Sequence, residues 1–106
     1  MNYNTVKETL EQNFNAVKAA DVNIDINVTV LGESEGEFSV SVHNGKCAID
    51  NTHADKVDIT VGFIDTDTMI AMFTEGANPM SLVMGGKMTV NGDLKKGREI
   101  KGLFMK

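Results

Sequence analysis

Apolar residues recur along this chain with two different periods, and the first is helical. Between residues 5 and 20 they follow the i, i+4, i+8, i+11 spacing of one helix face, at Val6, Leu10, Phe14 and Val17. Asn4 or Thr5 can cap such a helix, and Glu8 stands three residues after Thr5, as in a capping box. The spacing therefore predicts a helix over Thr5–Ala20.

Strict alternation of apolar and polar residues follows, which predicts strands with one buried face. The inward positions of three successive strands are Ile24, Ile26, Val28 and Val30, then Phe38, Val40 and Val42, then Cys47 and Ile49. Between the second and third strands, Asn44-Gly45 favours a two-residue type I′ turn. The first three strands are therefore expected to form an antiparallel meander.

The turns also predict how these strands pair, because a slip of one residue would turn the apolar side chains to solvent. The turn at 44–45 predicts three opposing pairs: His43 with Lys46, Val42 with Cys47, and Val40 with Ile49. A loop over 32–36 predicts two pairs in the first hairpin: Val30 with Phe38, and Val28 with Val40.

The second half of the chain predicts strand, helices, strand and helix. A polar connection over Asn51–Lys56 leads to a strand whose inward residues are Val57, Ile59 and Val61. Asp65 or Thr66 can cap a helix that runs to about Thr74 and ends at Gly76. Asn78-Pro79 is typical of a second, short helical start, and Gly85-Gly86 ends it.

A last strand and a last helix complete the chain. Met88 and Val90 belong to the strand, which stops at Asn91-Gly92, and Asp93 caps the helix. Its inner stripe is expected at Leu94, Gly97, Ile100 or Lys101, and Phe104.

The segment over residues 68–84 carries more apolar surface than one sheet face needs. Ten of its seventeen residues are apolar, and Glu75 is its one charged residue. Methionines are concentrated here, and their unbranched, polarizable side chains suit walls that fit variable guests. Two interpretations stay open: a core in which methionine fills gaps, or a cavity for an apolar ligand between this segment, the sheet and the last helix.

Composition bounds the class of protein. The chain has 106 residues, 42% of them hydrophobic and 24% charged, which predicts one globular domain over residues 1–106. No apolar run approaches the ~20 residues of a membrane-spanning helix, and the opening residues lack the pattern of a signal peptide, so we expect neither feature. With a single cysteine, Cys47, and no Ser-Lys-Leu ending, we expect a cytoplasmic protein.

Charge disfavours nucleic acid as a partner, because the net charge is −5. Residues 86–106 nevertheless carry six basic residues against Asp93 and Glu99, a net charge of +4 that leaves −9 for residues 1–85. The basic end is either a solvated helix face or a surface that steers towards anionic partners, including a membrane.

No catalytic constellation is expected, and no metal or cofactor. A zinc site at His43, Cys47 and His53 is disfavoured because the hairpin places His43 and Cys47 on opposite sheet faces. Cys47 is expected to be a buried, inert thiol. Asp65 and Asp67 are expected to cap a helix rather than to serve as acid and base.

An ordered set of short patterns gives the chain a family resemblance. Asp58 opens a strand, an acidic pair at 65 and 67 starts a helix, and Gly76 precedes Asn78-Pro79. Gly86-Lys87 then opens a strand that ends at Gly92. In the order and spacing of these short patterns, the chain resembles the sterol carrier protein 2 (SCP2) domain. The resemblance is strongest over residues 57–104.

The resemblance implies an α+β fold, with a mainly antiparallel five-stranded sheet and helices packed on one face. It implies a non-enzymatic carrier that holds a fatty acid, an acyl-CoA or a sterol-like lipid in an apolar tunnel, without a cofactor. We expect the tunnel lining at Met69, Met72, Phe73, Met80, Val83, Met84, Ile100, Leu103 and Phe104. A lipid head group or an anionic surface is expected to meet Lys95, Lys96, Arg98 and Lys101.

The chain departs from the family pattern at two places. Gly62-Phe63-Ile64 is expected to be an insertion that lengthens the link from strand to helix. The tail after Phe104 is short, so one end of the tunnel is expected to be open or to be closed by a partner. An alternative function also stays open: the apolar surface would be an interaction module, as a homodimer interface or a dock for a partner enzyme.

Overall fold

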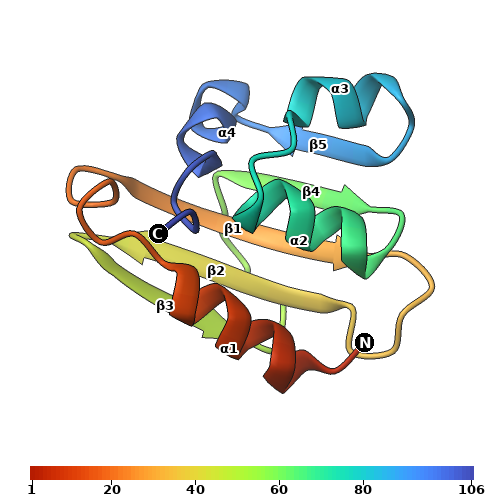
Figure 1. Ribbon diagram of the computed structural model, residues 1–106, viewed down its shortest axis with the longest axis horizontal. Helices are drawn as coiled ribbons and strands as arrows, with labels where there is room; N and C mark the ends of the chain where they lie inside the picture. Colours follow the sequence, from red (N-terminus) through yellow and green to blue (C-terminus); the bar gives the residue numbers. More distant parts are fainter.

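The computed structural model describes all residues from Met1 to Lys106 and contains one five-stranded sheet with four helices (Figure 1). In chain order the elements are α1 (Tyr3–Asn13), β1 (Asn23–Val30), β2 (Glu37–His43), β3 (Lys46–Asp50), β4 (Ile59–Phe63), α2 (Thr66–Thr74), α3 (Pro79–Met84), β5 (Met88–Gly92) and α4 (Leu94–Ile100). The strand order is β3-β2-β1-β4-β5, and β1 and β4 form the one parallel pair. The predicted α+β class and the mainly antiparallel sheet are confirmed.

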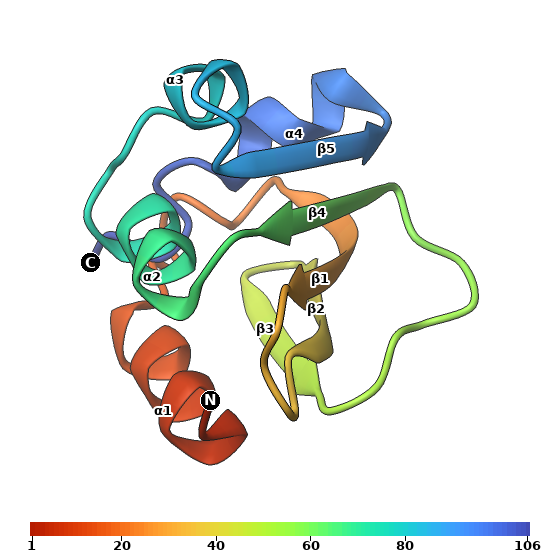
Figure 2. The same cartoon turned by 90° about the vertical axis from the view of Figure 1, so that its right-hand side faces the viewer.

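The helices divide into two groups (Figure 2). Helices α1 and α2 cover one face of the sheet, whereas α3 lies against the edge strand β5 and α4 packs against β4 and β5. The core lies beneath α1 and α2, where the Phe63 and Phe73 ring centroids are 5.9 Å apart and those of Phe73 and Phe104 are 5.5 Å apart. Such tilted and edge-on pairs suit the quadrupoles of the rings.

The β2–β3 hairpin has the predicted register, with Val42 opposite Cys47 and Val40 opposite Ile49. Its turn residues Asn44 and Gly45 have φ angles of 54° and 76°. Both are positive, as a type I′ turn requires. This turn was predictable because it depends on two adjacent residues alone.

The predicted register of the first hairpin is wrong by two residues. Phe38 faces Val28, not Val30, and Val40 faces Ile26. The ladder extends further than expected, because the Val30 N–H donates to the Gly36 carbonyl oxygen at 2.7 Å. A slip of two residues keeps the same side chains facing the core, so the burial pattern survives the change.

The first helix begins and ends earlier than predicted. Asn2, rather than Asn4 or Thr5, caps α1 by accepting a hydrogen bond from the Thr5 N–H. The helix ends at Asn13 because the Asn15 N–H donates to the Leu103 carbonyl oxygen at 2.7 Å, a contact with the other end of the chain. Val17, predicted on the apolar stripe, is therefore 87% exposed.

The expected long link from strand to helix at 62–64 is absent, because Gly62 and Phe63 belong to β4 and only Ile64 and Asp65 separate β4 from α2. Gly62 lies close to β5, where a Cβ atom would stand 2.6 Å from the Thr89 hydroxyl oxygen. The predicted cap at Asp93 is confirmed, and of the two alternatives Asp65 and Thr66 it is Asp65 that caps α2. The predicted helical start at Asn78-Pro79 is also confirmed, with the Asn78 side chain as its cap.

Candidate functional site

An apolar hollow of about 530 Å³ opens between β4, β5, α3 and α4. Nine of the fourteen residues that line it are hydrophobic. The lining comprises Ile59, Val61, Met72, Asn78, Pro79, Met80, Val83, Met88, Val90, Leu94, Gly97, Arg98, Ile100 and Lys101.

The floor of the hollow comes from alternation on two neighbouring strands. Val61 of β4 lies opposite Val90 of β5, and Met88 pairs with Phe63. The strand period of two turns Ile59 and Val61 to the same side, so both reach the hollow. The floor is therefore part of the sheet itself.

The inner wall comes from α4, which two glycines place close to the sheet. Gly92 has a φ angle of 119°, and a Cβ atom there would stand 2.6 Å from the Asp58 carbonyl oxygen. The positive φ angle and the short distance therefore each exclude a side chain at residue 92. Gly97 lies where a Cβ would approach the Ile59 Cδ1 atom to 3.0 Å, so α4 crosses directly over β4.

The outer wall is α3, which has no buried residue. Asn78 caps it and Pro79 occupies its first turn, so the helix forms locally in spite of its length of six residues. Met80 and Val83 line the hollow and are also 67% and 41% exposed. The hollow is thus open to solvent along this helix.

Four of the residues expected to line a tunnel lie around this hollow: Met72, Met80, Val83 and Ile100. Four others lie in the core below α2, with at most 1% exposure: Met69, Phe73, Leu103 and Phe104. Met84 is on the outer side of α3 and is 82% exposed. The hollow therefore lies nearer the β5 edge than the sequence suggested.

Sequence reasoning did not assign the strand residues of the lining to a site. Ile59, Val61, Met88 and Val90 were expected only as inward residues of the sheet. The signal that could have identified them is the pairing of β4 with β5, since the inward side chains of paired strands lie side by side on one face of the sheet. Leu94, expected on an inner stripe, lines the hollow while remaining 66% exposed.

The four basic residues expected to meet a head group divide into two pairs. Arg98 and Lys101 line the hollow and are its only charged residues. The Lys96 Nζ donates to the Asn23 carbonyl oxygen at 2.7 Å, so it is held away from the hollow. Lys95 is exposed and does not line it.

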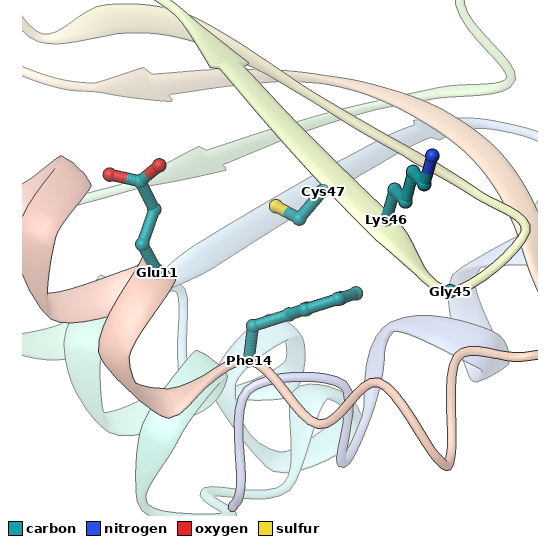
Figure 3. Close-up of a pocket in the computed structure, with 5 residues that line it drawn as sticks. All are labelled: Glu11, Phe14, Gly45, Lys46 and Cys47. Carbon is teal, nitrogen blue, oxygen red and sulfur yellow. The ribbon is translucent and has the colours of Figure 1, made fainter.

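A second, shallower hollow of about 410 Å³ lies between the end of α1 and the β2–β3 turn (Figure 3). Glu11, Phe14, Gly45, Lys46 and Cys47 line it. Burial, assisted by the Glu11 carboxylate, raises the pKa of the Cys47 thiol to about 11. The thiol is therefore protonated at neutral pH and is a poor nucleophile.

The two histidines do not converge with Cys47. His43 is exposed and its ring nitrogens contact Asn23 and Asp25 at 3.2 and 3.1 Å. His53 lies against β1, where its Nε2 is 3.0 Å from the Val28 carbonyl oxygen. No group of three or more His, Cys, Asp or Glu residues is placed to hold a metal ion.

The structure is a small α+β domain with an apolar hollow beside the β5 edge of its sheet. The chain belongs to the SCP-2 sterol transfer family, whose family model matches residues 4–105. Domains of this family generally bind lipids rather than catalyse reactions, although the fold also occurs within enzymes. No curated protein sequence matches significantly. None of the helices has the length and apolar character needed to cross a membrane.

Solved structures share the fold at low sequence identity. A sec-alkylsulfatase, Pisa1 from Pseudomonas sp., matches with a TM-score of 0.76 and 20% identity over 92% of this chain, which spans only 15% of that enzyme. The ubiquinone synthesis protein UbiJ-SCP2 matches with a TM-score of 0.65 and 15% identity, over 81% of this chain and 72% of that one. Palmitated SCP2L2 from Aedes aegypti matches with a TM-score of 0.56 and 18% identity over 88% of both chains.

Proposed function

We propose that the hollow between β4, β5, α3 and α4 holds the apolar part of a lipid, and that the protein carries this lipid without altering it. The observation that supports the proposal is the lining: nine hydrophobic residues around about 530 Å³. This volume lies within the roughly 300–1,000 Å³ typical of small-molecule sites. A fatty acid, an acyl-CoA or a sterol-like lipid could each place an apolar portion there.

Burial of the chain supplies the binding energy, about 0.8 kcal/mol for each methylene removed from water. Met72, Met80 and Met88 give the wall side chains that can adjust to ligands of different shape. The solved structure of a palmitated SCP2 protein with this fold supports an acyl chain as the guest.

Arg98 and Lys101 are proposed to select an anionic head group. Arg98 lies in the last turn of α4 and Lys101 is the residue that directly follows the helix, and both line the hollow. A carboxylate or phosphate at the end of a bound chain would find two cations there and no carboxylate of the protein. The lining also contains no histidine, cysteine, serine or acidic residue, which favours a carrier over a catalyst.

The test compares uptake of a fluorescent fatty acid by two tryptophan variants. Val83→Trp would fill the hollow from its exposed wall, and we expect the affinity to fall at least about tenfold, which corresponds to the loss of about two buried methylenes of the ligand. Val17→Trp is the matched control, because Val17 is exposed and does not line the hollow. Equal uptake by both variants and the unmodified protein would place the lipid elsewhere.

A second candidate is a role as an interaction module, as a homodimer or as a dock for a partner enzyme. It is favoured by the recurrence of this fold as a part of a larger sec-alkylsulfatase. Sedimentation velocity separates the two candidates: a tight dimer that takes up no fluorescent fatty acid supports the interaction module, whereas a monomer that takes it up supports the carrier.

A further inference from the structure

Exposed apolar side chains are concentrated on the two helices beside the hollow. The molecule exposes eight large hydrophobic residues, and half of them lie on α3 and α4: Met80, Val83, Met84 and Leu94. The exposed fractions of Met80, Met84 and Leu94 are 67%, 82% and 66%. Three of them, Met80, Val83 and Leu94, line the same hollow, and exposed apolar side chains gathered in this way are typical of a binding surface.

Basic residues accompany these apolar side chains. Lys95, Arg98 and Lys101 all lie on or directly after α4, within a segment of net charge +4 on a chain of net charge −5. The acidic residues of this stretch are Glu99 and Asp93, and the Asp93 carboxylate accepts hydrogen bonds from the Lys95 and Lys96 N–H groups. The surface therefore combines exposed hydrophobic groups with an excess of positive charge.

We propose that this surface, the docking face formed by Met80, Val83, Met84, Leu94, Lys95, Arg98 and Lys101, binds the surface of an anionic phospholipid membrane. Its apolar side chains would enter the boundary between head groups and acyl chains, and its cations would meet the lipid phosphates. Because Met80, Val83 and Leu94 also line the hollow, docking brings the opening of the hollow against the lipid. The biological meaning of this contact rests on the proposed function.

Charge decides between a membrane and the other occupants of such a face. In a symmetric dimer the same patch meets itself, which would bring the positive charges of the two copies together. Nucleic acid is disfavoured because the docking face carries no aromatic side chain for stacking, and the rest of the chain is acidic. An anionic lipid surface satisfies both the positive charge and the exposed methionines.

The test measures co-sedimentation with two kinds of vesicle: phosphatidylcholine alone, and phosphatidylcholine mixed with an equal amount of phosphatidylglycerol. We expect binding to the anionic vesicles only, and weaker binding as salt shortens the range of the electrostatic attraction. The double variant Met84→Ser, Lys95→Glu should bind about tenfold more weakly, since each charge near such a surface contributes several-fold. Neither residue lines the hollow, so uptake of the fluorescent fatty acid in solution should be unchanged.

The matched control is Leu31→Ser, Lys56→Glu, which likewise replaces one exposed hydrophobic residue by serine and one exposed lysine by glutamate, at positions away from α3 and α4. It should bind anionic vesicles as the unmodified protein does. The proposal is overturned if the unmodified protein ignores phosphatidylglycerol, or if Met84→Ser, Lys95→Glu binds as tightly as the control. Failure of the proposed function is a separate result, in which vesicles are bound but no fatty acid is taken up in their absence.

Discussion

Asp25 lies on the polar face of β1, where hydrogen-bond donors surround its carboxylate. The Ser41 hydroxyl donates to Asp25 Oδ1 at 2.7 Å, and His43 Nε2 lies 3.1 Å from the same oxygen. These contacts, with the Ser41 hydrogen bond the largest, hold the pKa of Asp25 below its ordinary value. A lowered folded-state pKa stabilises the fold above the unfolded pKa of about 3.9, and this stabilisation is lost as the pH falls through the lower folded value.

Ser41→Ala should therefore raise the pKa of Asp25 towards its ordinary value, because the hydroxyl donor is lost. An NMR titration of the Asp25 carboxyl carbon measures the change directly. Ser39→Ala is the control, since Ser39 lies on the same strand face and has no hydrogen bond to Asp25. An unchanged Asp25 titration in Ser41→Ala would show that another group stabilises the carboxylate.

Cys47 should react slowly with alkylating reagents. Burial raises its pKa from 9.0 to about 11, so the thiolate fraction near pH 8 falls about hundredfold below that of an ordinary thiol. The rate of modification by iodoacetamide should increase about tenfold per pH unit until the pH approaches 11. A rate that levels off near pH 9 would contradict the placement of Cys47 beneath Phe14 and the end of α1.

Among the elements, the β2–β3 turn offers the clearest test of local backbone preference. Gly45 has a φ angle of 76°, and the space around it would accept a methyl group without a clash. Gly45→Ala should thus cost about 1 kcal/mol of unfolding free energy through backbone strain alone. Urea denaturation measures it, with Asn44→Gly as the control.

Asn44 also has a positive φ angle, of 54°, which glycine adopts freely. Asn44→Gly should therefore change the free energy of unfolding by less than about 0.5 kcal/mol. If Asn44→Gly were as destabilising as Gly45→Ala, the cost would come from a lost side-chain contact rather than from backbone conformation.

The elements differ in how far the sequence could predict them. The turn at 44–45 and the caps at Asp65 and Asp93 depend on neighbours within a few residues, and the structure confirms them. The end of α1 depends on the hydrogen bond from Asn15 to Leu103, which joins distant parts of the chain. The first hairpin likewise slips because Leu31 bonds to Phe63 of β4 and Val30 to Gly36. The hydrophobic pattern along the sequence contains none of these three hydrogen bonds.

At the scale of the whole molecule, the sequence located the candidate site approximately and the lining residues only in part. It pointed to the methionine-rich stretch, the sheet and the last helix, and the hollow lies among these parts. It could not tell which side of α2 faces the hollow, since Met69 and Phe73 are equally apolar and lie in the core. That distinction depends on where the β5 edge lies relative to α2, which only the assembled fold determines.

The seven methionines supply the most direct test of the central claim, that the hollow beside β5 is the lipid site. Met72, Met80 and Met88 line the hollow, whereas Met1 and Met69 do not. The measurement is a palmitate titration of protein carrying ¹³C-methyl methionine, followed by NMR. The account predicts that the resonances of Met72, Met80 and Met88 shift with one common affinity, while those of Met1 and Met69 stay in place. Shifts confined to Met69, or no shift at any methionine, would contradict it.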